Sequence, residues 1–397
     1  MKRITTLLLI FVTSITALTV YAKEPTFKKI VLSDQFYAEG SHYGDFNKDG
    51  KIDVVAGPYW YESPEFTRKH EIYPVESFKP ENYSDNFTIF GTDLNGDTWD
   101  DVFVCPHPGK QGYWFENPQG KNEHWKKHLG PKEVGNESQL WTDVVKDSGK
   151  SLIYNTNGNL GFSTYEIKNG QPEWTFHAVS PKDKRFQRYT QGLGCGDINH
   201  DGRIDLIEKT GWWEQPEDIK SQWKFHPYKF ADEAAHILVY DVNGDGLNDV
   251  VTVWHCHLYG LVWHKQLKKK DDEKDAEITW ERNEIIPIKP DFNSDALRIT
   301  QMHALAAADF NGDGLLDFVT GKRFWAHGPK GDKEADAPAV LYWFELKREN
   351  NNAKFIPHKI DDNSGVGTQV TTVDLNNDKT PDIIVSNKKG TFIFLSE

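Results

Sequence analysis

The stretch Asp309-Phe310-Asn311-Gly312-Asp313-Gly314-Leu315-Leu316-Asp317, followed at once by the apolar run Phe318-Val319-Thr320, decides how this chain folds. Carboxylate or amide oxygens stand at positions 1, 3, 5 and 9 of the stretch, a spacing that suits a hard cation such as calcium. Gly314 permits the tight turn that folds alternate side chains inward. No helix pattern flanks the stretch, and apolar runs of β type lie on both sides. The stretch therefore predicts a calcium-binding loop between two strands.

The same phrase recurs along the chain at intervals of 44 to 68 residues. One copy alone would be an ordinary Asx turn, but six copies, each before an apolar run, make chance matching very unlikely. A seventh, decayed copy begins at Asp143, where Val144-Val145 replaces the amide, so we expect no calcium there. The predicted calcium ligands are Asp45, Asn47, Asp49, Asp53, Asp93, Asn95, Asp97, Asp101, Asp197, Asn199, Asp201, Asp205, Asp241, Asn243, Asp245, Asp249, Asp309, Asn311, Asp313, Asp317, Asp374, Asn376, Asp378 and Asp382.

Each repeat also carries an aromatic third strand, such as Tyr342-Trp343-Phe344-Glu345, and a fourth strand. The last repeat lacks a fourth strand, and a spare copy stands near the N-terminus at Phe27-Lys28-Lys29-Ile30-Val31-Leu32. A repeat of about fifty residues with four strands indicates a propeller or a solenoid. The sequence therefore predicts an all-β, seven-bladed β-propeller whose ring is closed by the N-terminal strand completing the last blade.

The first 22 residues show a basic start, an apolar run from Leu7 to Val20 and small residues before Lys23. This pattern predicts a secretory signal peptide over residues 1–22, cleaved after Ala22, and a secreted or periplasmic protein. Residues 23–397 are then one propeller domain, which we expect to be a monomer without a membrane span. The formal net charge of −14 argues against nucleic acid as a partner.

Propeller geometry places the calcium loops on one face and sorts the remaining polar residues. First-strand starts and second-strand exits should meet at the opposite face, around the central axis. This axial set predicts the catalytic candidates His303, His236, His107, His255, His257, Arg323 and His327, and the substrate-binding candidates His42, Tyr59, Trp60, Lys110, Lys322, Trp325, Gln369 and Lys388. Histidine can move a proton or bind a metal, so a second, catalytic divalent ion is a further hypothesis, with His236 or His303 completing a site with His255-Cys256-His257. Arg323 is the candidate anion clamp, whereas histidines on the fourth strands, such as His226, should lie far from the axis and be structural or solvent-facing. The alternative is a wet channel lined with polar fillers.

The repeated DxNxDGxxD phrase resembles the FG-GAP/VCBS repeat family, and the match covers nearly the whole mature chain. Gly57-Pro58-Tyr59-Trp60-Tyr61-Glu62, Met302-His303-Ala304-Leu305 and Gly321-Lys322-Arg323-Phe324-Trp325-Ala326-His327 more loosely resemble the propeller domain of aldos-2-ulose dehydratase and related secreted bacterial propellers. That resemblance implies elimination of water from a sugar, for example at the end of an oligosaccharide from an acidic algal polysaccharide.

Three classes of function remain open on the sequence. The first is a carbohydrate dehydratase, a carbon–oxygen lyase acting on an anionic, ulvan-type oligosaccharide, with a polysaccharide lyase that uses the same parts as its variant. The second is a calcium-dependent binding or adhesion propeller in which Tyr59-Trp60 stacks on sugar. A glycoside hydrolase is third, because it needs two facing carboxylates and Glu39 is the one candidate found on the axial face.

Overall fold

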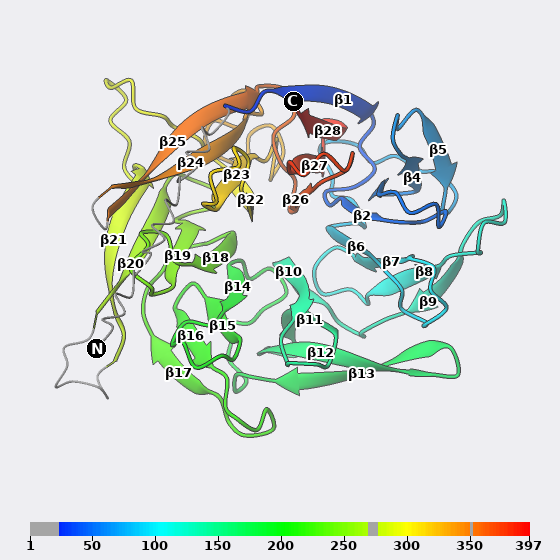
Figure 1. The fold of residues 1–397 in the computed structure, drawn as a ribbon, viewed down its shortest axis with the longest axis horizontal. Coiled ribbons are helices and arrows are strands. Elements are labelled where there is room, and N and C mark those ends of the chain that lie inside the picture. Colours follow the sequence, from blue (N-terminus) through cyan, green and yellow to red (C-terminus); the bar gives the residue numbers. More distant parts are fainter. Residues whose placement is uncertain (1–23, 269–276, 350–351) are drawn as a thin grey trace, which may run out of the picture.

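The computed structural model describes residues 24–268, 277–349 and 352–397, which form an all-β structure (Figure 1). The predicted signal peptide, residues 1–22, lies outside the described residues. Seen down the shortest axis, the sheets follow one another around a common centre, in a β-propeller arrangement. The described residues contain no helix that could span a membrane.

Five of the six sheets have four strands each, and consecutive strands pair antiparallel. In chain order, the first three are β2 (His42–Gly44), β3 (Asp53–Ala56), β4 (Tyr59–Glu62) and β5 (Arg68–Glu71); β6 (Thr88–Thr92), β7 (Asp101–Cys105), β8 (Tyr113–Glu116) and β9 (Lys126–Leu129); and β10 (Gly135–Asp143), β11 (Lys150–Thr156), β12 (Asn159–Lys168) and β13 (Gln171–Ala178). The sixth repeat forms β22 (Met302–Ala308), β23 (Asp317–Lys322), β24 (Leu341–Glu349) and β25 (Asn352–Asp361).

The last four-stranded sheet joins the two ends of the described chain. Strand β1 (Phe27–Ser33) pairs antiparallel with β28 (Gly390–Ser396), which continues to β27 (Asp382–Asn387) and β26 (Val370–Val373). The N-terminal strand is thus the outermost strand of the sheet built by the last repeat, as Figure 1 shows at the top of the molecule.

The fourth and fifth repeats share one eight-stranded sheet. The strand pairing therefore gives six sheets, and not the seven separate blades that the sequence predicts. Its members are β14 (Leu193–Gly196), β15 (Asp205–Glu208), β16 (Gly211–Glu214) and β17 (Lys224–Pro227), then β18 (His236–Tyr240), β19 (Asp249–Val253), β20 (Leu261–Leu267) and β21 (Thr279–Ile286). The two halves are joined where Leu193 and Gly194 pair in parallel with His236 and Ile237. Gly194 permits this approach, because a Cβ there would lie 2.3 Å from the Ile237 carbonyl oxygen.

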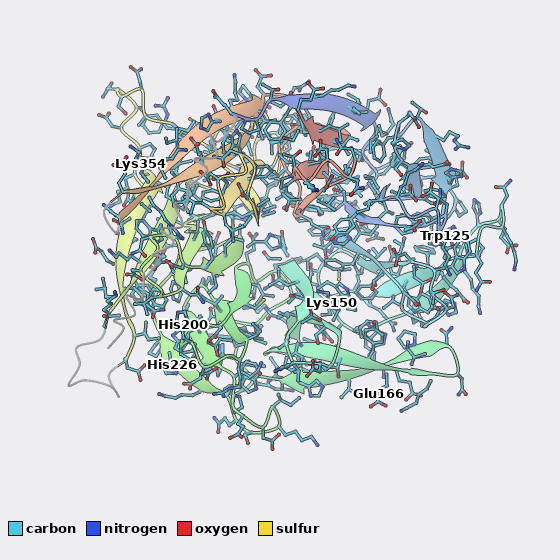
Figure 2. The ribbon with its side chains drawn as sticks, in the orientation of Figure 1. Trp125, Lys150, Glu166, His200, His226 and Lys354 are labelled. Carbon is cyan, nitrogen blue, oxygen red and sulfur yellow. The ribbon has the colours of Figure 1, made fainter. Side chains whose placement is uncertain are left out.

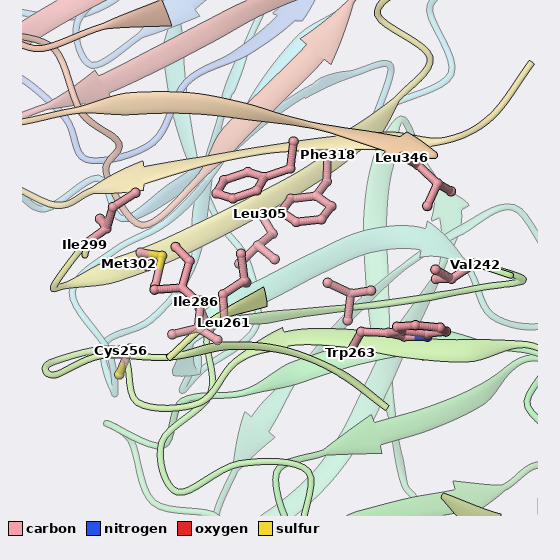
Figure 3. Packing of buried hydrophobic residues seen from close by; sticks show 14 residues of the cluster. Val242, Cys256, Leu261, Trp263, Ile286, Ile299, Met302, Leu305, Phe318 and Leu346 are labelled. Atoms are coloured by element: carbon pink, nitrogen blue, oxygen red, sulfur yellow. The ribbon is translucent and has the colours of Figure 1, made fainter. Parts of the chain in front are cut away.

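Apolar side chains fill the space between neighbouring sheets. One cluster joins Leu261 and Trp263 of β20 to Leu305 of β22 and Phe318 of β23 (Figure 3). Burying a side chain of this kind stabilises the fold by about 1.5–3 kcal/mol. Because strands β3, β7, β19, β23 and β27 are buried on both faces, their sequences read as apolar runs and not as an alternation.

The ninth-position aspartate of each of the six loops is fully buried and holds two backbone amides. In the sixth repeat, Asp317 accepts the N–H of Phe310 through Oδ2 at 3.2 Å and the N–H of Leu346 through Oδ1 at 2.8 Å. The same pair of bonds is made by Asp53, Asp101, Asp205, Asp249 and Asp382. The residue therefore ties the loop to the end of the third strand in every such repeat.

Histidines on the outer strands are structural. His226 of β17 stacks on Trp212 with a ring separation of 4.0 Å, and its Nε2 lies 2.7 Å from Glu214. Figure 2 labels His226 at the lower left of the molecule. The same cross-strand stack on a tryptophan, with a glutamate at Nε2, recurs at His70, His128 and His358. These side chains lie at the periphery, as the sequence predicted for the fourth strands.

Candidate active site

Residues from five repeats line a cavity of about 340 Å³ beside the inner strands. They lie before or near the start of first strands, or after second strands, which is where the sequence placed the axial face. The lining residues are Tyr83, Phe87, His107, Glu137, Tyr189, Gln191, His257 and His327. Three of the predicted catalytic histidines, His107, His257 and His327, are among them.

A carboxylate joins two of these histidines. Asp332 Oδ1 lies 2.9 Å from His327 Nδ1 and 3.4 Å from His257 Nδ1. Burial raises the pKa of Asp332, but its interactions with both imidazoles outweigh burial and hold this pKa well below the usual range. The hydrogen bond to Asp332 in turn raises the pKa of His327, which favours the protonated ring.

The other nitrogen of His257 is an acceptor. The side-chain N–H of Gln191 lies 3.1 Å from His257 Nε2, so donation from Gln191 leaves Nε2 without a proton. The proton then stands on Nδ1, which faces Asp332. His257 is therefore arranged as a neutral base oriented by a carboxylate, with its basic nitrogen on a residue that lines the cavity.

The His303 ring packs edge to face with the His257 ring, with 4.9 Å between the ring centroids. Its Nδ1 lies 2.9 Å from the Gln301 carbonyl oxygen, while its buried Nε2 has no hydrogen-bond partner in the described part of the chain. Burial, followed by the charges of Arg323 and His257, lowers the pKa of His303 well below its usual value. A neutral imidazole that donates through Nδ1 to a carbonyl is the arrangement found in metal-ligating histidines.

Three groups of potential metal ligands, with ligand atoms within 4.8 Å of one another, gather here. They are Cys256, His257 and His303; Glu233, His255 and Cys256; and His257, His327 and Asp332. Within the described residues, none of the groups found in this way belongs to the aspartate loops. The sequence left open whether His236 or His303 would complete a site with His255-Cys256-His257, and it is His303 that lies there.

Arg323 has a different role from the predicted anion clamp. Its side chain is 2% exposed and forms ion pairs with Glu39 and, at 3.3 Å, with Glu137. Both carboxylates come from other repeats, so Arg323 neutralises charges across the axis, and it is not among the residues that line the cavity. Lys322 is also buried, and it donates to Thr300 Oγ1 at 3.0 Å and to the Glu334 carbonyl oxygen at 2.8 Å.

Three further substrate-binding candidates lie at this face with their polar groups engaged. Lys388 donates to the Trp325 carbonyl oxygen at 2.8 Å and lies 4.8 Å from the centre of the Tyr83 ring. Burial lowers the pKa of Lys388 to about 8. The indole N–H of Trp325 donates to Asp336 at 2.9 Å, and Lys110 pairs with Asp85 at 2.5 Å.

Tyr59 and Trp60 do not form an exposed sugar platform, which corrects the sequence prediction. They are 6% and 7% exposed, because the third strand is packed between sheets. Trp60 stacks on His70 at 3.9 Å, and Tyr59 belongs to an apolar cluster with Tyr37 and Tyr61.

Three other candidates serve contacts between repeats. The backbone N–H of Gly91 donates to His42 Nδ1 at 3.2 Å, and the side-chain amide of Gln369 bonds both backbone groups of Ile89. His236 is 7% exposed and is absent from the three potential ligand groups of the described chain. Burial lowers the pKa of both His42 and His236 to about 4, so both are neutral.

The structure adds residues that the sequence did not single out. Glu137 and Asp332 place two more carboxylates at this face, and Tyr83 and Tyr189 line the cavity. Glu137 opens the first strand of the decayed third repeat, and Asp332 lies between β23 and β24, a connection of 18 residues. The unusual length of that connection was the available signal, since long loops often carry functional residues.

A larger groove of about 780 Å³ lies between the outer strands of the first two sheets. Its tryptophans, Trp60 and Trp125, are each 7% exposed. Its Glu62 contacts Arg68 and His70, and its Glu71 contacts His124. The groove offers no unpartnered buried polar group, among the residues described, and we place the candidate site at the smaller cavity.

Comparisons with known proteins do not assign a family. No family model matches the chain, and no curated protein matches it. One solved structure, described as "Crystal structure of rhamnogalacturonan lyase YesW", is 12% identical, with 93% of this chain and 75% of that chain covered at a TM-score of 0.45. Similarity at this level carries no argument about chemistry, so the resemblances to FG-GAP/VCBS repeats and to aldos-2-ulose dehydratase stay predictions.

Proposed function

We propose that the protein is a carbon–oxygen lyase that eliminates water from a carbohydrate at the cavity beside the inner strands. The observation that carries this proposal is the arrangement of His257, Asp332 and His327. It joins a neutral base to a histidine that favours its protonated form through one shared carboxylate. A β-elimination needs such a pair, because one group must remove a proton while another supplies one.

The proposed step uses the two histidines in opposite senses. Once the substrate displaces the Gln191 amide, His257 Nε2 takes the proton from the carbon next to a carbonyl or carboxylate of the sugar, and the carbon–carbon double bond forms as the carbon–oxygen bond breaks. His327 gives a proton to the departing hydroxyl, which leaves as water. Asp332 keeps the proton of His257 on Nδ1 and stabilises the positive charge that develops on that ring.

A divalent ion at Cys256, His257 and His303 is an alternative form of the proposal, in which His257 does not act as the base. The ligand atoms are close enough, and the buried Nε2 of His303 has no partner among the described residues. A thiolate and two imidazoles suit zinc, which when bound would act as a Lewis acid at a carbonyl or carboxylate oxygen. His257 would then be a ligand, and His107 would remain to take the proton, because burial lowers its pKa and keeps it neutral.

The substrate class follows from the size of the cavity. A volume of about 340 Å³ is at the lower end of the range for ligand pockets, which favours one terminal sugar over the middle of a polymer. A chain-cleaving lyase would use the same groups with a sugar as the leaving group. A glycoside hydrolase is disfavoured even though three carboxylates are present, because Glu39 and Glu137 pair with Arg323, and Asp332 contacts two histidines.

The proposal is tested by incubating the protein with uronate-terminated oligosaccharides. Ultraviolet absorbance reports an unsaturated uronate, and the product mass separates loss of water from chain cleavage. His257→Ala and Asp332→Asn should abolish turnover, whereas His70→Ala, at the periphery, should retain it. Binding without any new chromophore would instead favour a carbohydrate-binding propeller and would remove the enzymatic assignment.

We also infer that the six loops bind structural calcium. In all six, the backbone N–H of position 5 donates to side-chain oxygens of both position 1 and position 3, so these oxygens converge. In the sixth repeat the distances from the Asp313 nitrogen are 3.2 Å to Asp309 and 3.0 Å to Asn311. Such convergence supports a calcium site. Asp143 of the decayed copy pairs with Lys150 instead.

The proposed function includes a closed ring of seven blades and export. Counting the eight-stranded sheet as two blades gives seven, one for each repeat. Thr371 Oγ1 donates to the Ser41 carbonyl oxygen at 2.8 Å, and the Thr368 N–H donates to the Glu39 carbonyl oxygen at 3.1 Å, which supports a closed ring between the last and first repeats. The predicted signal peptide, residues 1–22, supports a secreted or periplasmic location.

A further inference from the structure

Arg188 is a free cation beside the cavity. Its guanidinium carbon lies 4.6 Å from the centre of the Tyr189 ring, and Tyr189 lines the cavity and meets His107 edge-on at 5.6 Å. Among the residues that the structure describes, no carboxylate pairs with Arg188 and no acceptor receives its side-chain N–H groups. Lys110 on the same side is already paired with Asp85.

Two glycines leave space for Arg188 at its place beside the cavity. A Cβ on Gly109 would lie 2.9 Å from Arg188 Cδ, and a Cβ on Gly135 would lie 3.2 Å from Arg188 Cα. Gly109 has a φ of +86°, a conformation in which other residues are strained. The Arg188 carbonyl oxygen also accepts the N–H of Asn136 at 2.9 Å. The exposed side chain therefore lies between a glycine surface and an aromatic ring, and none of its five N–H donors bonds to a residue that the structure describes.

We propose that Arg188 is the anion-binding residue of this site and that it selects a substrate bearing a carboxylate or a sulfate ester. Three residues further along the same segment, Gln191 contacts His257 Nε2. Three residues span at most about 10 Å, so one short oligosaccharide can reach both the clamp and the base. A planar guanidinium binds a carboxylate through two parallel hydrogen bonds, which lysine cannot reproduce. Arg323, buried and doubly paired, is excluded from this role.

The inference rests on the proposed function for its substrate, and its test separates the two. Turnover is measured on a uronate-terminated oligosaccharide and on its methyl ester, a neutral counterpart that keeps the carbonyl next to the reacting carbon. Arg188→Ala should raise KM for the uronate compound about 10- to 100-fold and leave KM for the neutral compound unchanged. Arg188→Lys should lie between, and the exposed Arg68→Ala on β5 should behave as wild type.

Equal effects of Arg188→Ala on both compounds, or no effect on either, would overturn the assignment. If wild type turns over neither compound, the elimination reaction is wrong, and calorimetric binding of the same pair still decides the role of Arg188. Preference of wild type for the uronate compound that disappears in Arg188→Ala supports the anion site. No binding of the uronate compound, or binding without preference, contradicts it.

Discussion

Replacing Asp317 by Asn separates two roles that a ninth-position aspartate can have. The carboxylate accepts one backbone N–H on each oxygen, at 3.2 and 2.8 Å, and is fully buried. Asn has nearly the same shape but a single acceptor, so its NH₂ group must face one of the two N–H donors. A buried donor left without its partner costs about 3 kcal/mol when the lost acceptor is charged.

The measurement is urea unfolding of Asp317→Asn and wild type, each with excess calcium and with EDTA. Burial raises the pKa of Asp317 to about 7, so the comparison is made at about pH 8, where the carboxylate is ionised. If the residue mainly holds backbone amides, the loss of about 3 kcal/mol persists in EDTA. Asp309→Asn is the matched control, because position 1 accepts N–H groups only from its own loop and is not buried. Its penalty should appear mainly with calcium present.

An Asp317→Asn protein as stable as wild type in EDTA would refute the reasoning, because the backbone bonds would then contribute nothing measurable. A penalty present only with calcium would make the residue a metal ligand first. Removal of calcium from wild type should lower its melting temperature, since an ion that binds only the folded state stabilises it by mass action.

Three further predictions follow from the buried groups. Burial lowers the pKa of His264 to about 4, below the value of about 6.5 in the unfolded chain. The free energy of unfolding is therefore highest above pH 6.5, and up to about 3 kcal/mol of it is lost as pH falls from 6.5 towards 4, because the unfolded chain binds the proton more readily. His264→Gln should make the free energy of unfolding, measured in urea, less dependent on pH in that window. Arg323→Ala should lower the free energy of unfolding by about 3–5 kcal/mol, because Glu39 and Glu137 would be buried without their cation; an unchanged urea midpoint would contradict the ion-pair role. His303→Ala should remove a zinc-type ion detected by elemental analysis, with the calcium-dependent melting transition retained, and undiminished metal content would contradict the ligand assignment.

Short-range sequence patterns were sufficient to predict the repeat. The loop phrase, the apolar run that follows it and the aromatic third strand are all short-range patterns, and they identified the strands, the loops and the outer-strand histidines. The N-terminal strand that pairs with β28 was also predictable, because it repeats the pattern of the missing fourth strand. Five repeats stand as separate sheets, and the fusion of the other two depends on a glycine that lets two backbones meet.

The sequence predicted the region in which the site lies, but not the exposure of each side chain there. Counting residues from the loops predicted one axial face, and His107, His257 and His327 line the same cavity. The same counting did not reveal that Tyr59 and Trp60 are buried, because a third strand packed on both faces can have the same sequence as one with a solvent-exposed face.

The sequence by itself determined which elements form and which face of the molecule carries the polar residues, because strand alternation and loop spacing act within a few residues. The tertiary structure alone decided which charges are free. Arg323 looked like a substrate clamp until Glu39 and Glu137, from repeats far away in the chain, were found beside it. No sequence motif marks Arg188. Its guanidinium is unpaired because no carboxylate of the described residues lies beside it, and two glycines leave space for the rest of the residue. Electrostatic pairing depends on distance in space, and sequence separation does not encode that distance.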